Sequence, residues 1–454
     1  MIKLIIEKEL KEIIASTKFA VTFGACSVLI LLSFYVGGRN YQIGAENYQA
    51  ALRGELRTFD GITDWKEVRD HSVFLPPQPI ASLVMGVSND IGRTTSVRPG
   101  ASIDAQDSRY SDEPIYAVFR FLDLEFIFQI VLSLFAILFA YDAVNGEKER
   151  GTLKLTFSNS VRRGTYILGK MAGSFLALAL PLLVPILLGV LLLVLMGIPL
   201  QQSDWYRLLL VIVAGYLYFG AFLAISLFVS SRTEKSSTSF LLALVIWVFS
   251  VMIIPRAAVL VAGRAVDVPS VDELTSKRSR YSASLWQDDR KKMADYQAPP
   301  GVPMDQVIRG FQGFMQKMNE DRDVKIRDFD ARLYEDRQNK LSVQEGLAFA
   351  IARISPSATF SMTATTAAGT GIRLKDEFTR AAERYQGSFA EFLKEKTGET
   401  PSGGMIFRIS TDSTGQKKPT INAAEIPTFT FQPQPVEAVL SSAAVNFGIL
   451  ALFN

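Results

Sequence analysis

The residue types that most often carry out catalysis are scarce in this chain, which has one histidine and one cysteine among its 454 residues. The histidine, His71, lies in a polar segment and is expected to be a solvated loop residue, whereas the cysteine, Cys26, lies in an apolar run. Zinc clusters and Cys-His or Ser-His-Asp nucleophiles need more such residues, and a lone cysteine forms no disulfide framework. We therefore expect no catalytic, cofactor-binding or metal-binding residues, and the chain is predicted not to be an enzyme.

A near match to a phosphate-binding loop occupies residues 164–171, which read Gly-Thr-Tyr-Ile-Leu-Gly-Lys-Met. A functional loop of this kind follows a β-strand and ends on Ser or Thr, whose hydroxyl holds Mg²⁺. Met171 stands in that place, and the segment runs directly into a long apolar stretch. We expect that this chain does not bind ATP by itself.

Three ionisable residues, Asp123, Glu125 and Arg256, lie at or within the borders of long apolar runs. Charged groups at membrane depth are costly and default to a functional hypothesis, so these three are candidates to line a substrate pathway. The alternative is that they lie near the outer ends of their runs and reach water by snorkelling, which is the commoner arrangement.

Long apolar runs must position these residues, because 48% of the chain is hydrophobic and the apolar residues are concentrated in blocks. A helix needs about 20 such residues to cross about 30 Å of hydrocarbon, which predicts an all-α polytopic membrane protein with about six transmembrane helices. The predicted spans are residues 18–37, 120–142, 171–200, 205–231, 236–262 and 436–454. The third contains Pro181 and Pro185, so it can tilt, kink or carry a re-entrant turn.

Lys and Arg residues in short loops set the orientation of a membrane protein. They gather in residues 3–18, 148–170 and 232–235, which fall on one side of the membrane if the predicted spans alternate. We expect that side to be the cytoplasm of a bacterial inner membrane, with the N-terminus inside. Residues 38–119 and 263–435 then face outward.

The N-terminal residues 1–17 are predicted to form an interfacial amphipathic helix with its isoleucines toward lipid, namely Ile5, Ile6, Ile13 and Ile14. A signal peptide is disfavoured because acidic residues interrupt the region that should be basic.

The outward segments are predicted to form a mainly helical extracytoplasmic domain with a small β element. Residues 270–396 show helical spacing of apolar residues among many charges. Alternation in residues 405–410 and 428–431 predicts a short β-hairpin near the return to the membrane. Residues 41–116 are rich in turns and give only a weak signal.

The segment between the second and third predicted spans, residues 143–170, is the most informative one. It reads Asn-Gly-Glu-Lys-Glu-Arg-Gly-Thr-Leu from Asn145 to Leu153 and closes on the pair Gly169-Lys170. An ordinary positive-inside loop whose charges only set topology is the simpler reading, and composition alone does not exclude it.

The order of residues in this loop resembles the coupling region of the permease subunits of ABC transporters of the ABC-2 type. In that family a Glu-x-Glu-x-Gly-Thr-Leu run precedes a basic residue and a Gly-Lys pair before the third span, although members often carry proline where Ser160 stands here. Residues 354–358 and 368–371 are similar to the end of the outer domain in a subgroup with a large extracytoplasmic insertion before the last span.

The resemblance implies that this coupling loop docks on a separate cytoplasmic ABC ATPase subunit. It assigns to that interface Glu147, Glu149, Arg150, Gly151, Thr152, Leu153, Arg163 and Lys170. It implies ATP and Mg²⁺ on the partner ATPase, none in this chain, and a second permease chain that is identical or related. The lipid bilayer is a further expected partner, and no nucleic acid is expected. The function it implies is ATP-driven transport, with export favoured.

Two other functions stay open. A membrane-anchored scaffold or assembly protein would use its outer helices to bind an extracytoplasmic partner and would need no ATPase. A secondary transporter is ranked last, because it should place ionisable residues near the bilayer midplane, and the predicted spans carry no Asp, Glu or His there.

Overall fold

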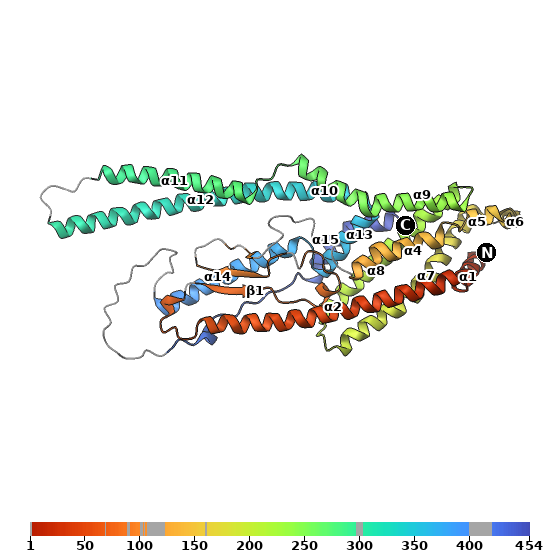
Figure 1. Ribbon diagram of the computed structural model, residues 1–454, viewed down its shortest axis with the longest axis horizontal. Coiled ribbons are helices and arrows are strands. Elements are labelled where there is room, and N and C mark those ends of the chain that lie inside the picture. The colour runs from red at the N-terminus through yellow and green to blue at the C-terminus, as the bar shows by residue number, and fades with distance from the viewer. Residues whose placement is uncertain are drawn as a thin grey trace. The chain divides into compact units, whose positions relative to one another are not determined.

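The computed structural model describes residues 2–68, 70–88, 91–99, 103, 105–106, 123–158, 161–296, 303–398 and 420–454. It is mostly helical and contains two compact units, the first formed by Met1–Pro255 with Arg353–Asn454 and the second by Arg256–Ala352 (Figure 1). The long helices of the first unit are α1 (Ile2–Ile14), α2 (Thr17–Thr58), α4 (Ser133–Ala140), α7 (Arg163–Leu195), α8 (Gln202–Arg232), α9 (Ser236–Val248), α13 (Pro356–Ala368), α14 (Arg373–Thr397) and α15 (Val436–Leu452). Its shorter helical segments are η1 (Trp65–Glu67), η2 (Ile80–Ser82), α3 (Leu124–Phe126), η5 (Ile127–Leu132), α5 (Asn145–Glu149), α6 (Thr152–Ser158), η6 (Phe249–Ile253) and η7 (Ala423–Glu425).

Within the described residues, five helices are long and apolar enough to cross a membrane. They cover Thr17–Thr58, Leu124–Glu149, Arg163–Leu195, Gln202–Arg232 and Ser236–Ala265. Helices suit this setting because all their backbone groups bond internally. The sixth predicted span corresponds to α15, an apolar helix of 17 residues that is about 26 Å long at 1.5 Å per residue. The count of six therefore stays a prediction.

Helix α2 is much longer than the first predicted span, because it continues through Gly37 and Gly38 as far as Thr58. The two glycines do not end the helix. A Cβ atom at Gly37 would lie 2.7 Å from the Ser82 carbonyl oxygen, and one at Gly38 would lie 2.7 Å from the Met196 sulfur. The glycine pair thus marks close packing of α2 against its neighbours.

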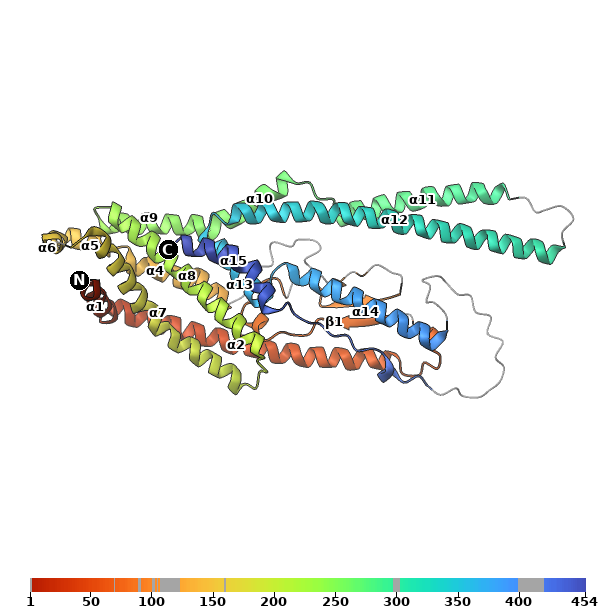
Figure 2. The same cartoon turned by 180° about the vertical axis from the view of Figure 1, so that it is seen from behind.

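Two of the apolar helices contain π-helical turns, η5 in the second apolar helix and η6 in the fifth. The third, α7, runs without a break through Pro181 and Pro185. Of the alternatives for that segment, the structure has a continuous helix and no re-entrant turn. Helix α2 packs on α7, and α4 and α7 both pack on α8, so that these helices lie side by side in Figures 1 and 2.

A small antiparallel sheet and α14 form a second hydrophobic core in the first unit, beside the later half of α2 (Figure 2). Strands β1 (His71–Phe74), β2 (Thr94–Val97) and β3 (Ala105–Gln106) pair in that order, with Ser72 opposite Ser96. The β element therefore lies in the segment that gave a weak signal. Residues 428–431 form no strand, so that part of the prediction is wrong, and residues 405–410 lie outside the described residues.

His71 belongs to this core, which corrects the expectation of a solvated residue. Its side chain is buried, its ring stacks on Phe59 with centroids 5.8 Å apart, and its Nδ1 lies 3.2 Å from the Tyr385 hydroxyl. Burial lowers the pKa of the His71 imidazole below its usual value. Alternation in β1 places His71 and Val73 on the buried face, and this explains why a polar segment hides a histidine.

The second unit contains α10 (Ile254–Ala265), which begins at its border, and a helical hairpin of α11 (Val271–Ala294) and α12 (Met304–Ala352). The two hairpin helices pack through paired aromatic and charged groups. Tyr281 stacks on Phe329 with ring centroids 4.1 Å apart, and the Arg322 guanidinium lies 3.8 Å above the Trp286 ring and bonds Asp289. The two helices confirm that this segment is helical.

Candidate functional site

The 143–170 loop folds into two short helices, α5 and α6, before α7 begins at Arg163. Gly151 separates them with a φ of 74°, a left-handed conformation that glycine adopts without the penalty of a side chain. The Thr152 hydroxyl donates to the Glu147 carbonyl oxygen at 3.3 Å and closes the turn from the other side. The Gly-Thr pair therefore determines where the helix breaks.

The Glu147 carboxylate is the centre of a buried cluster behind α5. One oxygen accepts hydrogen bonds from the Lys8 ammonium at 2.9 Å and lies 3.0 Å from the Lys170 ammonium, while the other accepts from the Tyr166 hydroxyl at 2.7 Å. Helix α1 supplies Lys8, and α7 supplies both Tyr166 and Lys170. The carboxylate thus joins α5 to α7 and to the distant N-terminal helix α1.

A second carboxylate, Glu9 on α1, also pairs with Lys170, and both side chains are almost fully buried. Burial raises the pKa of Glu9, and the adjacent Lys170 opposes that shift. With Glu147 and Lys8, the cluster contains two acidic and two basic side chains, so its charge is balanced. That balance is what makes burial of Glu9, Glu147 and Lys170 tolerable.

Close packing of α1 on α7 brings these charges together. A Cβ atom at Gly169 would lie 2.9 Å from Ile5, and one at Gly173 would lie 2.7 Å from the Glu9 Cβ. Two glycines four residues apart lie on one face of a helix and let another helix approach. A helix forms where the amphipathic helix is predicted, but Ile5 and Glu9 face α7 and Ile13 is buried, whereas Ile14 is exposed. The place of this helix at the membrane interface stays a prediction.

On its other side, α5 is bonded to the end of α8 and to the turn between α8 and α9. The Ser230 hydroxyl donates to the Asn145 side-chain oxygen at 3.1 Å and accepts from the backbone N–H groups of Val144 and Asn145. The Asn145 amide donates to the Thr233 hydroxyl at 3.0 Å. Asn145 and Ser230 are fully buried, so these bonds are shielded from water.

Two charged residues extend this attachment. The Lys148 ammonium donates to the Ser231 carbonyl oxygen at 2.6 Å and to the Thr233 carbonyl oxygen at 3.1 Å. The Glu149 carboxylate accepts from the Ser236 backbone N–H at 2.8 Å and from the Ser236 hydroxyl at 3.0 Å. Ser236 is the first residue of α9, and a carboxylate there also suits the helix dipole. Helix α5 is therefore held on two opposite sides.

The predicted interface residues divide into exposed and buried groups. Arg150, Gly151, Thr152 and Arg163 are exposed, as is Glu149 apart from its bonds to Ser236. Leu153 is half-buried against a small apolar cluster, and Glu147 and Lys170 are buried. Leu155 on α6 is 67% exposed. The surface available to a partner thus runs from the end of α5 along α6.

Sequence reasoning missed Lys8, Glu9 and Tyr166 behind α5, and it missed Asn145 with its partner turn. The four-residue spacing of Gly169 and Gly173 was a signal for a helix packed on α7. The lysines and glutamates of the cluster carry no sequence signal of their burial, because exposed and buried residues of these types look alike in sequence.

The candidate pathway residues Asp123 and Glu125 lie together at the start of the second apolar helix, and both are buried. Asp123 caps that helix by accepting from the Phe126 N–H at 2.8 Å, and its other oxygen accepts from the Met85 N–H at 3.0 Å. Glu125 accepts from the Ser361 hydroxyl of α13. Arg256 belongs to the second unit and is exposed. The two carboxylates are thus bonded inside the protein.

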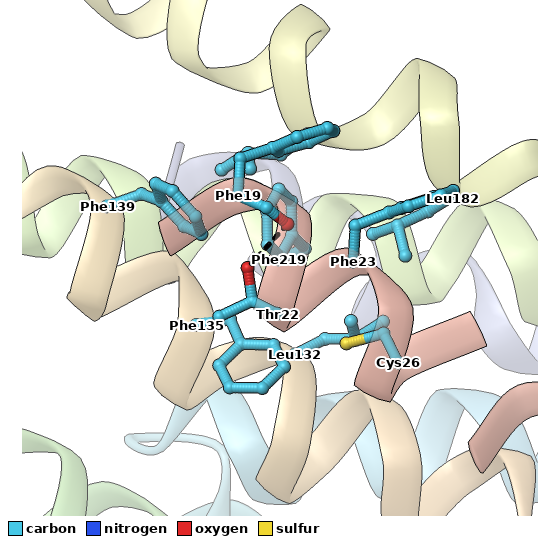
Figure 3. A pocket seen from close by; sticks show the side chains of 10 residues that line it. Phe19, Thr22, Phe23, Cys26, Leu132, Phe135, Phe139, Leu182 and Phe219 are labelled. Atoms are coloured by element: carbon cyan, nitrogen blue, oxygen red, sulfur yellow. Dashed lines mark hydrogen bonds between the residues drawn. The ribbon is translucent and has the colours of Figure 1, made fainter. Parts of the chain in front are cut away.

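A small apolar cavity lies between α2, η5, α4, α7 and α8 (Figure 3). Phe19, Phe23, Cys26, Phe135 and Phe219 are among its lining residues. Its volume is about 20 Å³, which is room for roughly one water molecule. This cavity is too small to hold a transported solute.

Comparison with known proteins agrees with the family that the 143–170 loop resembles. The family model described as ABC-2 family transporter protein matches residues 4–352. A probable ABC transporter permease protein NosY of Stutzerimonas stutzeri is 33% identical over 127 residues, which are 27% of this chain and 45% of that protein. The protein of the same name from Pseudomonas aeruginosa is 31% identical over 128 residues, 28% of this chain and 46% of that protein. The chain thus matches less than half the length of these relatives.

Proposed function

Since this chain belongs to the ABC-2 family of transporter proteins, we propose that ATP hydrolysis on a separate cytoplasmic ATPase subunit drives its spans to move a solute across the membrane. The chain is an ABC transporter permease with several membrane-spanning helices. The proposed direction is export. The proposed assembly pairs this chain with a second permease, identical or related, and with ATPase subunits that hold ATP and Mg²⁺.

The observation that carries this proposal is the double attachment of α5. Its buried side bonds α1 and α7 through Glu147, and its other side bonds the α8–α9 turn through Asn145, Lys148 and Glu149. A loop that only set topology would need none of these bonds. A force applied to α5 and α6 would instead reach four helices at once, as a lever requires.

The exposed face is the proposed docking surface for the ATPase. It offers the Arg150 guanidinium, the Thr152 hydroxyl and the apolar Leu155 side chain together. An interface of this kind gains affinity from burying the apolar side chain and specificity from the charge. Glu147 and Lys170 take a different part in this proposal, because they hold the loop in position from behind.

The proposed location is the cytoplasmic membrane of a bacterium, with α1, α5 and α6 on the cytoplasmic side. The basic residues of the short loops support this orientation. In that orientation the sheet, α14 and the α11–α12 hairpin belong to the extracytoplasmic domain.

The test is an affinity purification of the detergent-solubilised chain from its native membrane, followed by identification of copurifying ATPase chains. Leu155→Asp changes the exposed face of α6, and Val343→Asp changes a comparably exposed apolar residue on α12. We expect an ATPase to copurify with the wild type and with Val343→Asp, and to be lost with Leu155→Asp. Because both substitutions are at exposed positions, a difference between them reports the surface and not folding.

Absence of an ATPase from the wild-type preparation would favour the scaffold function instead, in which the extracytoplasmic helices bind a partner. Loss of the ATPase with both substitutions would mean that the interface lies elsewhere or that neither variant is intact. Retention with both would remove α6 from the interface.

A further inference from the structure

The fifth apolar helix is bonded to other elements at its start and in its middle. At its start, Ser236 bonds Glu149 of the coupling loop, as described above. In its middle, the Trp247 indole N–H donates to the Ser133 hydroxyl of α4 at 2.8 Å, and both side chains are buried. One continuous helix therefore contacts the coupling loop and the core of the bundle.

The π-helical turn η6 follows directly after Trp247 and Val248. Such turns are rare in helices and are frequent at functional sites. A π turn holds one residue more than the α-helical pattern accommodates, so a local change between the two patterns shifts the helix that follows. The fifth apolar helix thus contains a segment at which a change to the α-helical pattern would shift the residues that follow.

Ser250 of η6 and Ser355 ahead of α13 form a buried pair. Their hydroxyl oxygens are 3.1 Å apart, and the Ser355 hydroxyl also lies 2.6 Å from the Ser250 carbonyl oxygen. The same Ser355 oxygen caps α13 by accepting from the Ser357 and Ala358 backbone N–H groups. The start of α13 is thus bonded directly to the π turn.

A second π turn meets the same helix. Gln129 of η5 donates from its side-chain amide to the Ser357 hydroxyl at 2.8 Å, and the backbone carbonyl oxygen of Gln129 accepts from the Tyr218 hydroxyl at 2.9 Å. The Phe360 ring of α13 stacks on Tyr218 with centroids 4.7 Å apart. Because all these groups are buried, separating them would leave polar atoms without partners, which is costly.

The chain enters and leaves the second unit at this pair of serines. The second unit begins at Arg256, a few residues after Ser250, and ends at Ala352, just before Ser355. Both covalent connections of the α11–α12 hairpin therefore start from one hydrogen-bonded point, which we call the root and define as Ser250, Ser355 and Ser357.

We propose that the fifth span, α9 with η6, transmits movement of the coupling loop to the root, so that the extracytoplasmic hairpin responds to ATP hydrolysis in the cytoplasm. This rests on the function proposed above. Glu149 and Ser236 are positioning residues at the cytoplasmic end of the span, and Ser250 and Ser355 are positioning residues at the root. The root holds the hairpin in one state and exchanges its hydrogen bonds when η6 rearranges.

The experiment uses the purified permease–ATPase complex with the single native cysteine removed as Cys26→Ala. The pair Ser250→Cys and Ser355→Cys places two thiols where the hydroxyl oxygens are 3.1 Å apart. We expect the rate of disulfide formation to change about fivefold or more between the nucleotide-free complex and the complex trapped with ATP and vanadate. Adding Ser236→Ala, which removes the hydroxyl partner of Glu149 and lies outside the proposed docking surface, should reduce that dependence on nucleotide while the ATPase stays bound.

The locked complex gives the second readout. Crosslinking the root should slow ATP hydrolysis by about tenfold, and reduction of the disulfide should restore it, which separates a lock from misfolding. The control pair Ser72→Cys and Ser96→Cys joins two residues already opposite each other in the sheet and should leave hydrolysis unchanged when crosslinked.

A crosslinking rate that ignores nucleotide, or full hydrolysis by the locked complex, would overturn the proposed transmission while leaving the transporter function in place. If the complex hydrolyses no ATP before any crosslinking, the transporter function on which this inference rests would be refuted, and the proposed transmission would be refuted with it.

Discussion

Replacement of Glu147 by glutamine tests whether the buried cluster holds the coupling loop in position. The substitution keeps the shape and one acceptor oxygen but removes the charge that Lys8 and Lys170 face. Lys8 is half-exposed, so water replaces its partner, but Lys170 is 3% exposed and depends on its carboxylates. Glu9 stays beside Lys170 after the change.

The expected cost follows from that geometry. Removing one partner of a buried ion pair costs about 3–5 kcal/mol, and hydrogen bonds to charged groups contribute about 1.5–3 kcal/mol. Because Glu9 still pairs with Lys170, Glu147→Gln should destabilise the protein by about 1.5–3 kcal/mol. Lys170→Gln should cost about 3–5 kcal/mol, since it leaves two buried carboxylates facing each other.

A double-mutant cycle measures the coupling directly. Glu147→Gln with Lys170→Gln restores the charge balance, so the double variant should be less destabilised than the sum of the single ones by about 1–3 kcal/mol. The assay is unfolding of the purified chain in mixed micelles, followed by tryptophan fluorescence. The control is Glu12→Gln, which changes an exposed partner of Lys8 and should cost less than about 0.5 kcal/mol. Additivity within about 0.5 kcal/mol, or a Glu147→Gln variant as stable as the control, would refute the cluster's role.

Three further predictions concern other parts of the chain. Since burial lowers the pKa of His71, the folded state favours the neutral ring, and stability should be lost as the pH falls below about 6.5. His71→Phe should flatten this pH dependence in thermal unfolding between about pH 7.5 and 5, and an unchanged slope would contradict the prediction. Gly173→Leu should push α1 away from α7, because a Cβ there would lie 2.7 Å from Glu9. We expect a loss of about 1–3 kcal/mol in the free energy of unfolding and faster hydrogen exchange in α1, and unaltered exchange would show that the contact is not tight. Gly151→Ala forces a side chain into a left-handed turn, so it should lower the free energy of unfolding by about 1–2 kcal/mol and weaken retention of the ATPase. In the same purification the control Gly164→Ala, whose added Cβ meets no atom within 4 Å, should retain the ATPase like the wild type.

One error of sequence reasoning has a clear physical origin. Alternation in residues 428–431 predicts a strand, but these residues form none, and the sheet is built from β1, β2 and β3 beside α14. Contacts with distant segments outweigh the local preference there. Gly37 and Gly38 border the first predicted span, and helix α2 continues through them with close packing at both positions.

The sequence by itself determined the apolar helices and the class of the protein, because insertion into lipid depends on runs of residues that are adjacent in the chain. It also determined the resemblance of the 143–170 loop to the permease family, since the order of residues from Glu147 to Leu153 is local. The break at Gly151 follows from the same stretch.

Only the tertiary structure decided which charges are buried and which face a partner. Lys8 and Glu147 are 139 residues apart, Glu9 and Lys170 are 161 apart, and Ser250 and Ser355 are 105 apart. Each pair forms because helices pack at a particular angle and depth, and that packing depends on side-chain shapes summed over whole interfaces. A serine or lysine carries the same local signal in either setting, so the root and the cluster behind α5 appear only when the helices are assembled.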